Sequence, residues 1–70
     1  MKESTIKLLA MDQRNYLSRV LESREYFKSI GKKYITVERD FFYEDEYRVY
    51  LTDTLERGHF DLEIVEYIEL

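Results

Sequence analysis

The chain has 70 residues, of which 44% are hydrophobic and 16% aromatic, with no cysteine, no proline and a single histidine. These values are typical of one small folded domain; they exclude disulfide bonds and count against a structural zinc site, which is built mainly from cysteine and histidine. A chain this short buries only about 60% of the surface that its unfolded form exposes, so oligomerisation is the remaining way to add stability.

The net charge of −4 conceals two halves of opposite sign. Residues 1–33 carry eight basic and four acidic side chains, a balance of +4, whereas residues 34–70 carry three basic and eleven acidic ones, a balance of −8. No apolar run is long enough to span a membrane, and the N-terminal residues lack the apolar core of a signal peptide. We therefore expect a cytoplasmic protein with no membrane contact.

The first element that the sequence predicts is one long amphipathic helix over residues 4–31. Ser4 or Thr5 is the expected N-cap, and Gly31 suits the left-handed position after a helix C-terminus. The apolar residues recur at the spacing of three and four that marks one helix face. They are Ile6, Leu9, Ala10, Leu17, Val20, Leu21 and Phe27.

A second reading starts the helix at Asp12, another good N-cap, and makes residues 5–11 a strand. The alternation in 5–11 does not separate apolar from polar residues, so we favour one helix that bends near Asp12–Gln13.

Three strands are predicted after the helix, at residues 33–43, 47–55 and 60–69, because apolar and polar residues alternate there. In the first strand Ile35 and Val37 face the helix. In the second, the inward residues are Tyr47, Val49 and Leu51.

The third strand has an irregularity. Its apolar residues share one face, but Glu66 interrupts that face, and a bulge near Val65 would restore the alternation. A C-terminal helix is the alternative for this segment. The apolar residues of the shared face are Phe60, Leu62, Ile64, Ile68 and Leu70.

The predicted fold is therefore α+β, with one long helix packed on a three-stranded antiparallel meander. Hairpins that pair Tyr43 with Tyr47 and Leu55 with Phe60 place a set of aromatic residues with an arginine on the face away from the helix. Such a patch is typical of an interface, although cross-strand pairing alone also explains it. Its members are Tyr34, Phe42, Arg48, Tyr50, Val65 and Tyr67.

Element lengths indicate a partner. A helix of about 26 residues is about 39 Å long, whereas a strand of eight or nine residues spans about 28 Å. The overhanging turns carry Ile6, Leu9 and Ala10, and a second copy of the chain is the simplest cover for them. We therefore expect a homodimer. A kink at Asp12–Gln13 that folds the first turns back is the alternative.

Two charged surfaces suggest further partners. Glu44, Asp45 and Glu46 form an acidic patch that suits docking on a basic partner or imitation of nucleic-acid phosphates, although a solvated, solubilising sheet surface is the favoured explanation. The basic helix face suggests nucleic-acid binding, but the acidic half would repel the same polyanion.

No catalytic constellation is evident. His59 follows Gly58 in a predicted turn, where Glu56 and Asp61 are the nearest carboxylates, and a surface histidine is the expected reading. The chain has no glycine-rich phosphate loop and no cysteine nucleophile. The sequence predicts a protein that is not an enzyme and holds no cofactor or metal.

The layout of one long helix and three strands in 70 residues without cysteine resembles the small YopT-type proteins of Bacillus prophages and other short phage-encoded accessory proteins. The resemblance implies a homodimer of subunits with a helix and three strands, and it transfers no functional residues. We therefore expect a small regulatory or accessory protein that binds another protein. An acidic nucleic-acid mimic and a nucleic-acid-binding helix are the alternatives.

Overall fold

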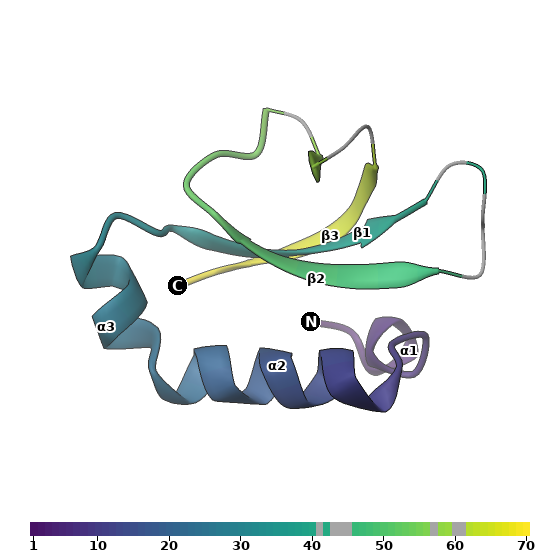
Figure 1. Cartoon of the computed structure of the whole chain (residues 1–70), viewed down its shortest axis with the longest axis horizontal. Coiled ribbons are helices and arrows are strands. Elements are labelled where there is room, and N and C mark those ends of the chain that lie inside the picture. Colours follow the sequence, from purple (N-terminus) through teal and green to yellow (C-terminus); the bar gives the residue numbers. More distant parts are fainter. Residues whose placement is uncertain (41, 43–45, 57, 60–61) are drawn as a thin grey trace.

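Three helices form one layer and a three-stranded sheet forms the other (Figure 1). The computed structural model describes residues 1–40, 42, 46–56, 58–59 and 62–70. The predicted α+β class with an antiparallel sheet is confirmed, and no helix of the described residues is long and apolar enough to cross a membrane. The elements are α1 (Glu3–Ile6), α2 (Met11–Glu22), α3 (Arg24–Ser29), β1 (Tyr34–Arg39), β2 (Tyr47–Thr52) and β3 (Glu63–Glu69).

The sheet order is β2-β1-β3, so the predicted meander in chain order is wrong. β1 is the central strand and pairs antiparallel with both neighbours. Its four inner residues, 35–38, are all buried, which suits a strand covered on both faces. β3 follows β2 in the chain but lies at the far edge of β1, and the described residues 53–56 and 58–59 lie over the outer face of the sheet (Figure 1).

The hairpin between β1 and β2 is wider than predicted. Arg39 lies opposite Tyr47, so the expected pair of Tyr43 with Tyr47 is wrong. The first strand ends early because the Asp40 carboxylate accepts the Phe42 backbone N–H at 2.8 Å, a turn that competes with the ladder. The shift is an even number of residues, so Val49 still faces the helices as predicted.

A bulge interrupts β3 at the predicted place. Val37 lies opposite Glu66, but the next residue, Glu38, lies opposite Ile64, so Val65 is the extra residue. The bulge turns Ile64 to the outer face while Ile68 stays with the core, and the predicted shared face of these two residues is wrong. The strand also starts at 63 instead of 60, and residues 60–61 lie outside the described residues.

The predicted single helix is interrupted twice. Residues 7–10 separate α1 from α2, and Ser23 separates α2 from α3. The first break is stable because the Arg14 guanidinium donates to the carbonyl oxygens of Leu9 at 3.0 Å and Lys7 at 3.2 Å, which lie beyond the end of α1. The first turns therefore fold back, as in the alternative reading, but the break lies upstream of the predicted Asp12–Gln13.

The helical segment ends at the predicted glycine. Gly31 has a φ of 91°, and the N–H of Lys32 bonds to the carbonyl of Phe27 while that of Gly31 bonds to Lys28. This is the Schellman arrangement, in which a left-handed residue closes the helix. The reversal leads directly into β1 (Figure 1).

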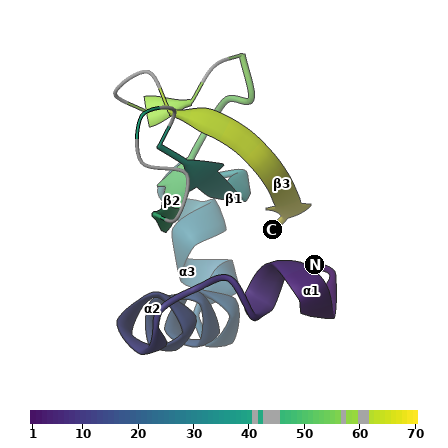
Figure 2. The same ribbon diagram turned by 90° about the vertical axis from the view of Figure 1, so that its right-hand side faces the viewer.

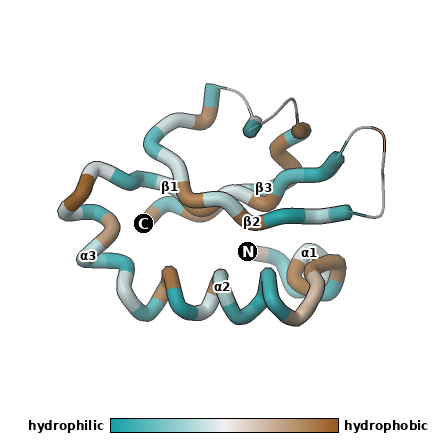
Figure 3. The backbone as a smooth tube through the Cα atoms, in the orientation of Figure 1, coloured by the Kyte–Doolittle hydropathy of each residue, from teal (hydrophilic) through white to brown (hydrophobic). Residues whose placement is uncertain are grey.

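A single small core lies between the layers. Figure 3 shows hydrophobic segments in both the helices and the sheet. The break at residues 7–10 carries Leu9 into this core, where the side chain is only 3% exposed. The predicted overhang of uncovered apolar turns therefore does not form. The buried apolar residues are Leu9, Leu17, Val20, Ile35, Val37 and Val49.

The side chain of Glu66 holds α1 against the helix face of the sheet. Its carboxylate faces the helix layer, and Oε1 accepts the backbone N–H of Lys2 at 2.8 Å, at the N-cap of α1. The Thr5 hydroxyl is the main cause of a lowered pKa of Glu66, and the N–H of Lys2 adds to it against the opposing effect of burial. The other carboxylate oxygen, Oε2, is buried and has no regular hydrogen-bond partner among the described residues. The acidic residue that interrupts the apolar face thus docks α1 beneath β3 (Figure 2).

This contact predicts an acid-sensitive part of the stability. Because folding lowers the pKa of Glu66, its ionised form stabilises the fold above the ordinary glutamate pKa of about 4.3. That contribution is lost as the pH falls through the lowered folded-state value. In thermal unfolding followed between pH 6 and pH 3, we expect Glu66→Gln to lose less stability on acidification than the wild type. The matched control is Glu69→Gln on the same strand, and equal pH profiles for all three chains would contradict the prediction.

Candidate interaction surface on the outer face of the sheet

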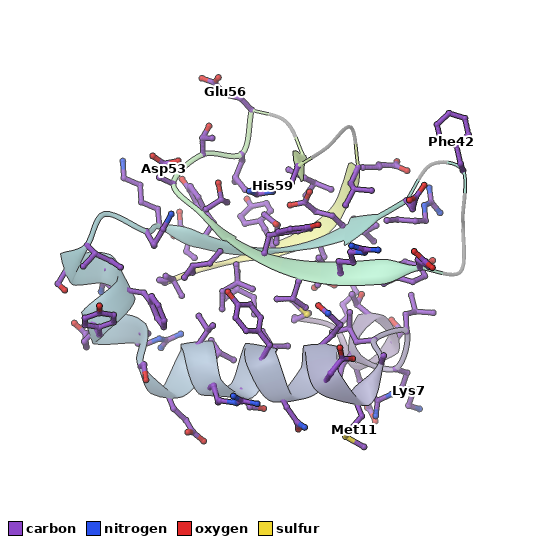
Figure 4. All side chains as sticks on the ribbon, viewed as in Figure 1. Lys7, Met11, Phe42, Asp53, Glu56 and His59 are labelled. Atoms are coloured by element: carbon purple, nitrogen blue, oxygen red, sulfur yellow. The ribbon has the colours of Figure 1, made fainter. Side chains whose placement is uncertain are left out.

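The face of the sheet away from the helices is mostly polar and aromatic, and part of it is covered. The described residues 53–56 and 58–59, between β2 and β3, lie above it, with His59 turned down toward the sheet (Figure 4). The register places nine side chains on this outer face. They are Tyr34, Thr36 and Glu38 of β1, Arg48, Tyr50 and Thr52 of β2, and Ile64, Tyr67 and Glu69 of β3.

A buried carboxylate lies at the centre of this face. Glu38 is fully buried, at 0% exposure. Its carboxylate accepts the backbone N–H of His59 and the hydroxyl of Thr36, and Oε2 lies 2.9 Å from Nδ1 of the His59 ring. Three donors thus compensate for the removal of one carboxylate from water. The group links the central strand to a residue 21 positions later in the chain.

His59 is held on two sides. Its ring stacks on Tyr50, with the centroids 4.3 Å apart and the planes 10° from parallel. Nδ1 faces Glu38, and no described residue is hydrogen-bonded to Nε2. A carboxylate that orients a histidine in this way is also found in general bases. Among the described residues, however, no nucleophile is hydrogen-bonded to the ring, so the visible role of this pair is to fix the connection to the sheet.

Gly58 makes this close approach possible. A Cβ on Gly58 would lie 2.0 Å from the carbonyl oxygen of Leu62 and 2.9 Å from Oε1 of Glu38. The Leu62 N–H in turn bonds to the carbonyl of His59 at 2.8 Å. Only a residue without a side chain fits here. We define the set of Glu38, Gly58 and His59 as the anchor.

The anchor divides the predicted aromatic patch. Tyr50 is covered by the ring of His59. Arg48 forms an ion pair with Glu46 at 3.4 Å, and this carboxylate, with the Tyr50 hydroxyl, raises the pKa of the Arg48 guanidinium. Arg48 lies on an outer strand and not at the centre of the patch as the meander predicted.

The other side of the patch is open. Tyr34 and Tyr67 meet edge to face, with ring centroids 5.9 Å apart. Tyr67 is 51% exposed and Val65 is 42% exposed. We call Tyr34, Val65 and Tyr67 the β3 patch.

The remaining predicted interface residues lie elsewhere. Phe42 is 89% exposed and projects from the hairpin that follows β1, away from the connection (Figure 4). Ile6 is half-buried, Leu9 belongs to the core and Ala10 is exposed, so these three residues do not form one surface.

The charged surfaces are only partly described. Glu44 and Asp45 lie outside the described residues, and the third member of the acidic patch, Glu46, is paired with Arg48. On the basic helices Lys7 pairs with Glu3 at 3.9 Å and Lys28 with Glu25 at 3.6 Å. Within the described part of the chain, no group of three or more histidine, aspartate or glutamate side chains is placed to hold a metal ion.

The two edges of the sheet differ. At the β2 edge the Val49 N–H donates to Oε1 of Gln13 at 2.8 Å, so a side chain of α2 satisfies one backbone donor of this edge. At the β3 edge the Leu70 N–H bonds to the carbonyl oxygen of Lys33, toward β1. Because backbone groups of successive residues in a strand point to opposite sides, those of Tyr67 and Glu69 point away from β1. No described residue is hydrogen-bonded to these outward groups.

Sequence reasoning missed the anchor. The nearby carboxylates Glu56 and Asp61 were the expected neighbours of His59, whereas its partner is the distant Glu38. The sequence contained one signal of this contact. Glu38 continues the outward alternation of Tyr34 and Thr36, which places a carboxylate on the outer face of the first strand.

Comparison of the chain with protein-family models, with curated proteins and with solved structures finds no match.

Proposed function

We propose that this chain is a small non-enzymatic interaction protein that binds a partner protein through the β3 patch and the open edge of β3. The observation that carries the proposal is the unpaired edge with exposed Val65 and Tyr67 beside it. An open edge offers backbone donors and acceptors to an added strand, and aromatic side chains beside it supply the contact area.

The differences between the edges and between the two sides of the patch support this assignment. The β2 edge is occupied by Gln13, and the β2 side of the outer face is covered by His59. Only the β3 side combines an exposed aromatic residue with an open backbone among the described residues. The role as a bacterial or phage accessory protein and the cytoplasmic location belong to the same proposal, and they rest on the size and the order of a helical segment before three strands.

Affinity capture with variants tests this proposal. From a lysate of the organism that encodes the chain, we expect Tyr67→Ser to reduce the retained partner at least tenfold, because it removes the exposed aromatic of the patch. Met11→Ser is the matched control, since Met11 is 67% exposed on the opposite layer (Figure 4). Retention that is equal for the wild type and both variants would contradict the proposal.

A further inference from the structure

We infer that the occupant of the β3 edge is the β3 strand of a second copy, paired antiparallel about a twofold axis at Tyr67. This inference rests on the proposed function and names its partner. The result is a continuous six-stranded sheet in the order β2-β1-β3-β3-β1-β2, with the helices of both copies on one side. The register follows from the direction of the backbone groups, the faces on which the side chains lie, and the charges of the paired residues.

Backbone direction fixes which residues can bond. The outward backbone groups of β3 belong to Tyr67 and Glu69, because the intervening Ile68 bonds inward to β1. An added strand must therefore form its close pairs at these alternate residues. The bulge at Val65 limits regular pairing to residues 65–69.

The faces on which the side chains lie exclude half of the registers in which β3 could pair with β3 of a second copy. Tyr67 and Glu69 lie on the outer face, and Glu66 and Ile68 on the helix face. A second copy related by a twofold axis perpendicular to the sheet keeps its outer face on the same side. Each outer residue must therefore oppose an outer residue, and a slip of one residue is excluded.

Length and charge select among the registers that remain. If Glu66 opposes Glu66 of the second copy, two carboxylates face each other at the twofold axis, and regular pairing reaches only residues 65–67. If Tyr67 opposes Tyr67, then Glu69 opposes Val65 and Glu66 opposes Ile68, so no two carboxylates are opposite each other. The strand is therefore self-complementary in the register centred on Tyr67.

The surroundings of the edge permit this approach. α1 lies on the helix side of β3 (Figure 2), where the Lys2 N–H contacts Glu66, and no described residue is hydrogen-bonded to the outward backbone groups of Tyr67 and Glu69. On the outer face, the edge-to-face pair of Tyr34 and Tyr67 in each copy would meet its symmetry mate. The β3 patches of the two copies would thus become one buried aromatic row.

The absence of cysteine from the chain allows a direct test. The paired Tyr67 residues would have Cα atoms about 5.5 Å apart, within disulfide range. Under mild oxidation we expect Tyr67→Cys to form a covalent dimer. Glu69→Cys, the matched control, should not form one, because its Cα atoms would be about 13 Å apart along the strands. A mixture of Val65→Cys and Glu69→Cys chains, in which Tyr67 is retained, should give the mixed covalent dimer.

Sedimentation equilibrium completes the test. We expect a wild-type dimer at micromolar concentration and at least a tenfold larger dissociation constant for Tyr67→Arg, which opposes two like charges at the axis. The inference would be overturned by a wild-type chain that remains monomeric. It would also be overturned if Glu69→Cys formed a covalent dimer and Tyr67→Cys did not. A monomer whose partner capture still depends on Tyr67 would overturn the second copy as occupant and leave the proposed function standing.

Discussion

Glu38→Ala is expected to lower the free energy of unfolding by about 3–5 kcal/mol, because it removes the buried acceptor of three hydrogen bonds. The truncation leaves the backbone N–H of His59, its ring N–H and the Thr36 hydroxyl without their acceptor. Each buried donor that loses its acceptor costs about 1–3 kcal/mol unless water replaces it. The half-exposed position of His59 admits some water, so the total falls below the sum of three full penalties.

Urea unfolding followed by far-ultraviolet circular dichroism measures this loss. The matched control is Glu56→Ala, which removes an exposed carboxylate from the same connection and is expected to change stability by less than about 0.5 kcal/mol. Equal midpoints for Glu38→Ala and Glu56→Ala would show that the buried carboxylate does not stabilise the fold. The total stability of a domain of this size is small, so the loss expected for Glu38→Ala is a large fraction of it and should lower the urea midpoint markedly.

Features that depend on neighbouring residues could be predicted from the sequence. The position of Gly31 after the helices, the inward residues of β2 and the bulge at Val65 all follow from the local pattern of apolar residues and glycine. The end of β1 could not, because the turn formed by Asp40 competes with an alternation that continues through the next residues. The helix break likewise depends on Arg14, whose side chain reaches back to carbonyls five and seven residues earlier.

The order of the strands required information that alternation does not contain. A meander and the observed order both keep Val37 and Val49 on the helix face, so the burial pattern fits either. What separates them is the stabilisation of Glu38 on the other face. In the meander the carboxylate has no assigned donor, whereas the observed crossing brings His59 over it. The contact between Glu38 and His59 is therefore specific to the observed strand order, and it depends on long-range pairing that the alternation does not encode.

The same pairing explains why half of the candidate site was predicted and half was not. Tyr34 and Tyr67 meet in the exposed patch because their strands are neighbours in the sheet, and Val65 is exposed beside them as the bulge residue of β3. Tyr50 was placed correctly on the outer face but is covered by a segment that the prediction treated as a short turn. A residue's face follows from alternation, but its exposure depends on what crosses above it.

Gly58→Ala is expected to lower the free energy of unfolding by about 2–3 kcal/mol, as an overpacked site does. The added methyl group meets the backbone oxygen of Leu62, which no rotamer change can move, so the turn must lift and carry His59 away from Tyr50 and Glu38. Urea unfolding measures the loss, and amide spectra should show changes at His59 and Tyr50.

Gly31→Ala separates steric crowding from backbone strain. Gly31 has a positive φ and no atom within 4 Å of an added Cβ, so the cost there is the left-handed conformation alone, about 1 kcal/mol. Because Gly58→Ala and Glu38→Ala both release His59, their effects should be strongly less than additive in the double variant, whereas Gly31→Ala should add fully to either. Full additivity of Gly58→Ala with Glu38→Ala would mean that glycine and carboxylate act separately, and that the crossing segment is held over the sheet by some other contact.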